Sequence, residues 1–211
     1  RDRSVSRGLG DVYKRQLTIN QPCHIVSSLE DDFEAGKEMI VEVANGELLT
    51  EVKINGVTVT HTLEGTQLKI KVPETAGANS ILELVSSDVS VKYTVSFAKV
   101  IWTGSFVTTS AWEGNQDLGW GNYDWSSVQP GTIITVYYTL DMEETNWQIK
   151  LGGCAIGWNP LPTIPSQSLE AGSTRFSATL TAEDLLVLSQ DNNAGLVVSG
   201  CNFTMTKITL K

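Results

Sequence analysis

The sequence has few of the residues from which reactive sites are built. Its 211 residues include two histidines, three cysteines and three methionines, and both histidines, His24 and His61, lie in the first third of the chain. No Cys-x-x-Cys pair or Cys/His spacing indicates zinc. No Gly-x-Ser-x-Gly elbow or phosphate-binding loop occurs, so the sequence contains no motif for acyl or phosphoryl transfer.

Positive charge and long apolar runs are also scarce. The chain has 24 acidic against 15 basic residues and a net charge of −9, which excludes the basic footprint of a nucleic-acid-binding protein. The acidic residues are spread along the chain, and this distribution favours a role in solubility. No apolar run approaches the roughly 20 residues that span a bilayer, so we expect no direct membrane insertion.

The three cysteines allow two interpretations. Cys154 and Cys201 lie in the similar settings GGC and SGC, and Cys23 lies far from both in the sequence. A Cys154–Cys201 disulfide is possible if the protein is exported. We favour the alternative, in which both are small buried hydrophobic residues.

The first half of the chain has the pattern of short β-strands separated by turns. Apolar and polar residues alternate in QLKIKV, and Asn55-Gly56 lies between two apolar stretches, which is a strong hairpin signal. Such strands without long helical stretches indicate a two-sheet sandwich. Strands are expected at 38–43, 51–60, 67–72, 81–85 and 89–97.

The same stretch resembles a known domain type. The pattern GKEMIVEV…VKINGVTV…LKIKVPETAGANSILELVSSDVSVKYTV is similar to the Ig-like fold of the TIG type. Bacterial surface proteins use that type as a spacer, so the resemblance implies an Ig-like spacer domain over residues 17–98. A short linker near residues 98–100 then leads to a second domain, residues 99–211.

The second half also predicts a sandwich, with one short helix. Thr181 followed three residues later by Asp184 has the form of a capping box, and leucines follow it. The segments 107–129 and 155–172 are expected to be long loops, which in a compact sandwich are more often functional than idle. Strands are expected at 100–106, 132–140, 147–151, 174–180, 195–199 and 203–210, and the helix at 180–188.

Tryptophan is concentrated in this half. All six tryptophans fall between Trp102 and Trp158. In the strand NWQIKL, alternation places Trp147 on the core face and Gln148 and Lys150 on the outer face. The same argument assigns Trp102 to the core or to the domain interface. In TIITVYYTL the residues expected to face inward are Ile134, Val136, Tyr138 and Leu140.

The remaining aromatic residues lie in Gly/Asn/Asp-rich loops. Rings held beside amides and carboxylates suit sugar recognition, because a pyranose stacks on the ring and the polar groups bind its hydroxyls. The stacking candidates are Trp112, Trp120, Trp125, Trp158 and Tyr123, and the hydroxyl-binding candidates are Asn122, Asp124 and Gln148. We expect at least one of the tryptophans to plug an end of the sandwich instead.

Two other functions remain open from the residues alone. In the first, the tryptophans are core and the protein is a structural adhesin or spacer. In the second, Asp117 or Asp124 works with another carboxylate in a small glycosidase, although nothing in the sequence fixes two carboxylates at a working separation.

The second half resembles a domain of gut Bacteroidetes. The stretch IWTGSF…WEGNQDLGW…VQPGTIITVYYTLD…NWQIKLGG…GWNPLP…FSATLTAEDLLVLSQDNNAGLVVSGCNFTMTKITLK is similar to β-sandwich domains of secreted glycoside hydrolases and surface glycan-binding proteins. The resemblance implies a non-catalytic, jelly-roll carbohydrate-binding module for plant β-glucans or hemicelluloses, placed outside the cell or at its surface. The resemblance is compatible with a catalytic domain missing upstream, and it implies no cofactor. Such modules often hold structural calcium, but no acidic cluster points to it, and the metal stays unknown.

The first 16 residues are set apart from this organisation. RDRSVSRGLGDVYKRQ holds five of the fifteen basic residues and resembles the translated read-through of a sequencing adapter. On that reading the native N-terminus, with any export signal, is missing, and the alternative is a natural basic leader. The overall expectation is an all-β chain: an Ig-like β-sandwich followed by a jelly-roll-type β-sandwich with one short helix.

Overall fold

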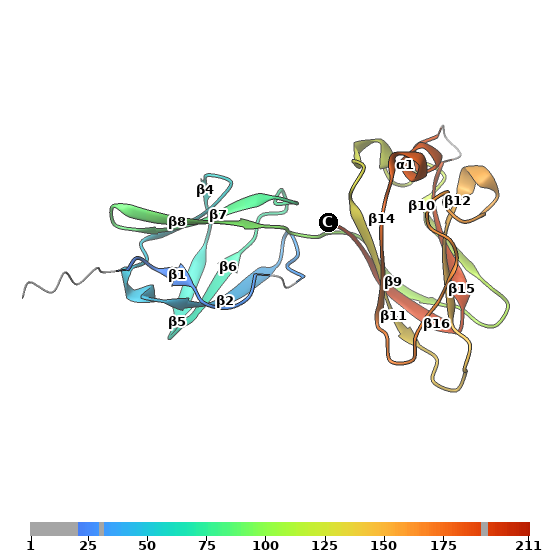
Figure 1. The fold of residues 1–211 in the computed structure, drawn as a ribbon, viewed down its shortest axis with the longest axis horizontal. Coiled ribbons are helices and arrows are strands. Elements are labelled where there is room, and N and C mark those ends of the chain that lie inside the picture. Colours follow the sequence, from blue (N-terminus) through green and yellow to red (C-terminus); the bar gives the residue numbers. More distant parts are fainter. Residues whose placement is uncertain (1–20, 30–31, 191–193) are drawn as a thin grey trace, which may run out of the picture.

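The chain is built mostly of β-strands. The computed structural model describes residues 21–29, 32–190 and 194–211, and the segment 1–16 lies outside them (Figure 1). The strands form four antiparallel sheets, as the all-β expectation requires. Two sheets come from the first half of the chain and two from the second, and each pair encloses its own hydrophobic core.

The first half forms sheets of the orders β1-β2-β6-β5 and β4-β3-β7-β8. Asn55 and Gly56 both have positive φ, 51° and 79°, and join β3 to β4 in the tight hairpin that the sequence predicts. The elements are β1 (His24–Ile25), β2 (Glu38–Ala44), η1 (Gly46–Leu48), β3 (Glu51–Ile54), β4 (Val57–Thr58), β5 (His61–Glu64), β6 (Gln67–Lys71), β7 (Ser80–Ser86) and β8 (Val89–Val95).

The second half forms two further sheets that face each other. We name the sheet β14-β11-β16-β9 the proximal sheet, and the sheet β10-β15-β12-β13 the distal sheet. The elements are β9 (Lys99–Val107), β10 (Gly114–Gly119), η2 (Trp125–Ser127), β11 (Ile133–Leu140), β12 (Gln148–Gly153), η3 (Cys154–Ile156), β13 (Gln167–Ser168), β14 (Arg175–Thr179), α1 (Ala182–Leu188), β15 (Gly195–Cys201) and β16 (Phe203–Leu210).

The core between these sheets follows strand alternation. The four residues predicted to face inward along β11 are buried: Ile134, Val136, Tyr138 and Leu140. Trp102 and Trp147 are partly buried and pack against the same core, as predicted. On the distal sheet, Leu196 and Val198 of β15 face the core, so Val197 and Ser199 point to the outer face.

Helix α1 begins where the sequence predicts. The Thr181 side chain accepts from the Asp184 backbone N–H, and Asp184 in turn accepts from Thr181, which completes a capping box. Asp184 is fully buried and also accepts from the N–H and hydroxyl of Thr163. Burial opposes its ionisation, but these hydrogen bonds outweigh it and hold the pKa of Asp184 below its ordinary value. The carboxylate thereby ties the loop between β12 and β13 to the helix.

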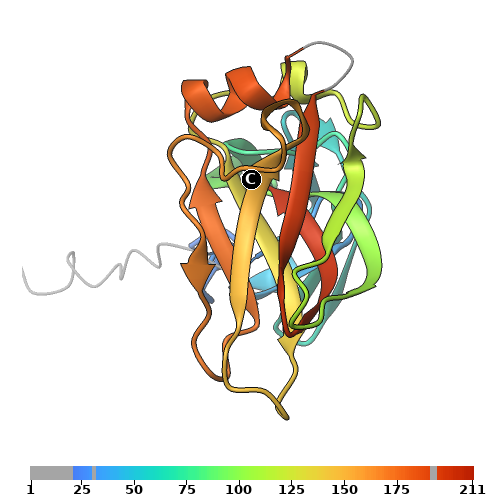
Figure 2. The same cartoon turned by 90° about the vertical axis from the view of Figure 1, so that its right-hand side faces the viewer.

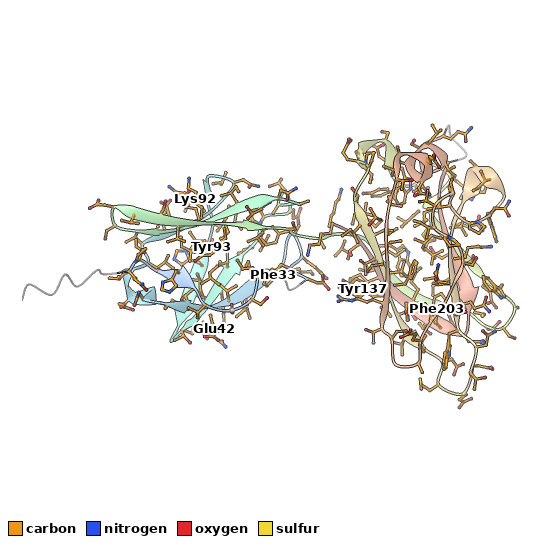
Figure 3. The ribbon with its side chains drawn as sticks, viewed as in Figure 1. Phe33, Glu42, Lys92, Tyr93, Tyr137 and Phe203 are labelled. Atoms are coloured by element: carbon orange, nitrogen blue, oxygen red, sulfur yellow. The ribbon has the colours of Figure 1, made fainter. Side chains whose placement is uncertain are left out.

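The proximal sheet faces the N-terminal sheets. Lys207 forms an ion pair with Glu34, and Arg175 forms one with Asp32. The Lys207 ammonium also lies 4.2 Å from the centre of the Tyr137 ring, and Figure 3 shows Tyr137 on the side of the C-terminal sheets that faces Phe33. The distal sheet lies at the other side of the sandwich, so its outer face points away from the N-terminal sheets (Figures 1 and 2).

Some elements differ from the prediction. The strands β1, β5, β10 and β13 were not expected, and β10 lies within the segment 107–129 that was predicted to be loop. Cys23, Cys154 and Cys201 are buried and unpaired, in agreement with the favoured interpretation. Within the described residues, no helix is long and apolar enough to cross a membrane.

Candidate functional site

Strand β10 is bordered by aromatic residues. Trp112 lies two residues before Gly114, where β10 begins, and Trp120 directly follows Gly119, where it ends. β10 is an edge strand of the distal sheet and pairs with β15. The outer face of this sheet, called the distal face below, is therefore flanked by tryptophan at both ends of its edge strand.

A third tryptophan reaches the distal face because two adjacent glycines of β12 let its loop fold back. The backbone N–H of Trp158 donates to the Gly153 carbonyl at 2.9 Å, and Gly152 forms an isolated β-bridge with Pro160. A Cβ atom on Gly152 would lie 2.7 Å from the Trp158 carbonyl oxygen, so a larger residue would push this loop away. The GGC segment of the sequence thus positions Trp158 over the sheet.

The Trp158 ring packs against β10 and β15. A Cβ atom on Gly114 would lie 3.2 Å from a carbon of the Trp158 ring and 3.0 Å from Val197 Cγ1. Val197 points outward but is completely buried, so the outer face is covered here. The absence of a side chain at Gly114 makes room for the ring.

Trp112 meets a lysine from the other side of β15. Lys150 on β12 and Gly114 on β10 both pair with Ser199 of β15, so the three share one face. The Lys150 ammonium lies 5.6 Å from the centre of the Trp112 ring. Since neighbouring strands are about 4.8 Å apart, Lys150 on β12 and Trp112 before β10 reach each other across the outer face of β15.

The turn that carries Trp112 is fixed at its base. The Glu113 carboxylate accepts from the backbone N–H of Thr109 at 2.6 Å and from its hydroxyl at 2.5 Å. These hydrogen bonds lower the pKa of Glu113. Thr108 is buried and exchanges hydrogen bonds with Phe203. The backbone under the ring is therefore held, while Trp112 as a whole residue is 36% exposed.

The six tryptophans fall into two groups, according to whether the indole N–H donates to a protein atom. Four of them donate to protein oxygen atoms: Trp102 to Asp117, Trp120 to Gln116, Trp125 to the Leu118 carbonyl and Trp147 to the Asp141 carbonyl. Over the described residues, the indole N–H groups of Trp112 and Trp158 have no acceptor. Buried tryptophans usually find such a partner, so these two rings keep a donor available to a ligand.

Backbone strain singles out the same region. Trp112, Trp120 and Trp158 have φ values of 62°, 54° and 64°, in the left-handed region. Asparagine tolerates this region, but a residue with a bulky side chain is disfavoured there by about 1–2 kcal/mol. Residues held in such conformations cluster at functional sites. Each of the three tryptophans that border β10 has this strain.

Trp120 is the most exposed of the three. The residue is 47% exposed, and the Gln116 side chain accepts its indole N–H at 2.8 Å. Asn122 follows it in an exposed turn. Gln148, another predicted site residue, lies half-buried on the outer face of β12, where its amide donates to the Asn146 side chain at 3.1 Å.

The remaining predicted site residues lie elsewhere. Trp125 is only 2% exposed, and its indole donates to the Leu118 carbonyl inside the core. Its ring therefore packs the sandwich and does not present a stacking face, which corrects its place among the candidates. The Asp124 side chain accepts from Ser126 and caps η2, but it remains exposed, so its contact with sugar hydroxyls stays a prediction.

Tyr123 also lies away from the distal face. Its ring packs edge-on against Trp125, with ring centres 4.9 Å apart. It lines a cleft of about 620 Å³ between the two halves of the chain, together with Phe97 and Leu210. Burial, and then the charge of Asp124, raise the pKa of Tyr123. It does not join the tryptophans at β10.

The carboxylate considered for catalysis is engaged in hydrogen bonds. Asp117 accepts from Asn115 and from the Trp102 indole, and these two bonds lower its pKa. A lowered pKa is the opposite of what a general acid requires near neutral pH. In the described ranges, no three His, Cys, Asp or Glu side chains gather as metal ligands.

Sequence reasoning missed part of this surface. It expected Lys150 to face outward, which is confirmed, but not its contact with Trp112. It did not single out Gly114 or Ser199, because their importance depends on which strands become neighbours. The polar, glycine-containing text GNQDLG gave no signal that β10 is a strand.

Comparison with known proteins supports the fold. No family model matches the sequence, and no curated protein matches it significantly. Among solved structures, the chain is similar to SGBP-B, a surface glycan-binding protein of the mixed-linkage glucan utilization locus of Bacteroides ovatus, solved with a mixed-linkage heptasaccharide. The identity is 14%, the match covers 87% of this chain and 50% of that one, and the TM-score is 0.56.

A second solved structure is SGBP-B from a complex xyloglucan utilization locus in Bacteroides uniformis. It has 11% identity and a TM-score of 0.37, and the match covers 90% of this chain and 71% of that one. At these identities the likeness to the first structure shows the fold alone, and the second is too distant for an argument. The chain spans about half the length of the first structure.

Proposed function

We propose that this protein binds polysaccharide without catalysis, at the distal face. Trp112, Trp158 and Trp120 are the stacking rings, and Gln148 and Asn122 contact sugar hydroxyls from the sheet and from the turn after β10. The observation that carries the proposal is that the three tryptophans with strained backbone all border one edge strand. Two of them, Trp112 and Trp158, also have an indole N–H without an acceptor among the described residues.

The magnitudes fit a weak site of this kind. Stacking of a flat ring on an aromatic side chain contributes about 1–3 kcal/mol per ring for nucleobases, and we assume the lower end for sugars. Two rings and a few hydrogen bonds correspond to dissociation constants from about millimolar to tens of micromolar. Such sites gain avidity when they are linked to a second module or to an enzyme.

The proposed ligand class is an extended plant β-glucan or hemicellulose. The rings follow the length of β10, and a strand of this length with its flanking residues extends over at most about 27 Å. A linear chain suits this arrangement better than a single sugar in a closed pocket. The ligand in the first similar structure, a mixed-linkage heptasaccharide, supports the same class.

We further propose that residues 17–98 form a spacer domain and residues 99–211 the binding domain. The distal face points away from the N-terminal sheets (Figure 1), so a spacer on that side would hold the site outward from a cell surface or an attached enzyme. This arrangement suits a protein that acts outside the cell.

Two alternatives fit less well. A structural spacer without a ligand would leave three strained tryptophans at β10 without a function, because none of them is fully buried. A glycosidase would need a general acid, but Asp117 has a lowered pKa and Asp124 caps η2.

The test is native affinity electrophoresis of residues 17–211 in gels that contain cellulose derivatives, mixed-linkage β-glucan, xyloglucan, xylan, mannan or starch. We expect retardation by a β-glucan or hemicellulose and loss of most of it in Trp112→Ala and Trp158→Ala. Tyr137→Ala, which removes a partly exposed ring from the proximal sheet, is the matched control and should migrate like the parent. The absence of retardation by every glycan, with folded parent protein, would refute the proposal.

A further inference from the structure

Ser199 is the most unusual polar residue of the distal sheet. It is 2% exposed, and its hydroxyl oxygen has no hydrogen-bond partner, which is true of no other buried side-chain oxygen or nitrogen in the described part of the chain. Buried polar groups are nearly always paired, and an unpaired one needs an explanation. Leaving such a group unsatisfied costs about 1–3 kcal/mol.

The hydroxyl lies at the centre of the proposed binding surface. β15 runs between β10 and β12, and Ser199 pairs with Gly114 on one side and Lys150 on the other. Gly114 has no side chain to satisfy it, and the side chain of Lys150 extends toward the Trp112 ring. Lys150 and Trp112 therefore contact each other across β15, on the same outer face as the Ser199 side chain.

The groups above Ser199 are able to move apart. The Lys150 side chain is long and makes no ion pair in the described segments, and the Trp112 indole N–H has no acceptor there. Their contact is a cation–π interaction at a partly exposed site, which contributes about 0.5–1 kcal/mol. A sugar ring that stacks on the same face of Trp112 would replace the ammonium on that ring.

We propose that the Ser199 hydroxyl is a direct contact to the bound glycan and helps to determine its specificity, with Lys150 and Trp112 covering it in the free protein. This inference rests on the proposed function, because the ligand is the glycan bound at the distal face. A hydroxyl that is unpaired before binding gains a hydrogen bond in the complex, whereas a paired one would exchange one partner for another. A site that hydrogen-bonds a sugar hydroxyl discriminates against analogues that lack it.

Ser199→Ala tests the inference, measured by calorimetric titration of the full chain with the glycan that retards the parent. We expect an affinity about threefold to tenfold weaker, which is the effect of one lost hydrogen bond. The melting temperature should stay equal or rise, because no partner is left unpaired. Ser177→Ala on β14, whose hydroxyl bonds to Thr135 at 2.8 Å, is the matched control and should bind like the parent.

Ser199→Cys gives a second measurement that does not depend on a loss of affinity. The three native cysteines are buried, so the parent protein supplies a low background rate with a soluble thiol reagent. We expect the variant to react faster than the parent, because Lys150 and Trp112 move apart and expose the new thiol. We also expect saturating glycan to slow that reaction. A reaction no faster than the parent, or one that glycan does not slow, would overturn the inference.

The outcomes separate the two proposals. If the parent binds glycan and Ser199→Ala binds equally well at unchanged stability, the role of Ser199 is overturned and the function stands. If the parent binds no glycan, the proposed function fails and the inference fails with it. Weaker binding by Ser199→Ala, with Ser177→Ala unaffected, supports both.

Discussion

The two outer faces of the C-terminal sheets differ in what they present. The proximal face carries Lys207 and Arg175, whose charges are paired with Glu34 and Asp32 of the N-terminal half, and its Tyr137 ring lies beside the Lys207 ammonium. These two charges are paired within the protein.

The distal face has the opposite property. Trp112 and Trp158 have unpaired indole N–H groups within the described ranges, and Ser199 has an unpaired hydroxyl. The strained tryptophans lie here as well. The charges of Lys207 and Arg175 on the proximal face are thus paired within the chain, whereas the distal face has hydrogen-bond donors that no atom of the described residues accepts. This difference locates the proposed site more sharply than the exposed fraction of the side chains does.

The largest expected effect comes from the carboxylate that fastens the loop carrying Trp158. Asp184→Ala removes the buried carboxylate that accepts from Thr163 and Thr181, and we expect it to lower the free energy of unfolding by about 3 kcal/mol. Denaturant unfolding measures this loss. Leu186→Ala, at the exposed face of the same helix, is the control and should change stability by less than about 0.5 kcal/mol.

The same carboxylate makes stability depend on acid. Because the folded pKa of Asp184 is lowered, its contribution is present above the unfolded value of about 3.9 and is lost as the pH falls through the folded pKa. We expect the free energy of unfolding of the parent to fall more steeply below about pH 4 than that of Asp184→Asn. Parallel pH profiles of the two proteins would contradict this account.

The ring contacts of the distal face should affect binding next. Trp112→Ala or Trp158→Ala should weaken glycan binding by about 5- to 150-fold, which corresponds to a loss of about 1–3 kcal/mol. Titration calorimetry with the best glycan measures this. Equal losses in Tyr137→Ala would remove the distinction between the two faces.

Gly114 tests whether the position of the Trp158 ring matters without removing it. Gly114→Val places carbon atoms where the ring and Val197 already lie, so we expect a loss of stability of about 1–3 kcal/mol and weaker glycan binding. Gly77→Ala is the matched control, because no atom lies within 4 Å of the added Cβ. Unchanged binding by a folded Gly114→Val would mean that the ring position is not critical.

The smallest effects are expected at the proximal face. Removal of the ion pairs by Asp32→Asn and Glu34→Gln should change the free energy of unfolding by less than about 1 kcal/mol. The change should shrink as salt is added, and glycan affinity should stay the same. A loss of affinity in these variants would connect the two faces and contradict their separation.

Local sequence signals predicted much of this fold. The Asn55-Gly56 hairpin, the capping box of Thr181 and Asp184, and the inward-facing residues of β11 depend on neighbours in the sequence or on simple alternation. Their physics is contained in a few consecutive residues, so the sequence alone was sufficient to predict them.

The site could be predicted only in part. Trp120 and Trp125 stand in similar glycine- and aspartate-containing text, yet one is half-exposed and the other is in the core. The difference arises because the Trp125 indole reaches the Leu118 carbonyl, a contact that composition does not indicate. The roles of Gly114, Lys150 and Ser199 likewise depend on the pairing of β15 with β10 and β12.

The most direct test of the central claim is to follow the six indole N–H resonances by NMR while the protein is titrated with a β-glucan or hemicellulose oligosaccharide, with each resonance assigned from a Trp→Phe variant. The account predicts that Trp112 and Trp158 shift most, since their donors are unpaired, and that Trp125 and Trp147, which donate to protein carbonyls, stay in place. Saturable binding that leaves Trp112 and Trp158 unshifted would show that the glycan binds elsewhere and would contradict the assignment of the site to the distal face.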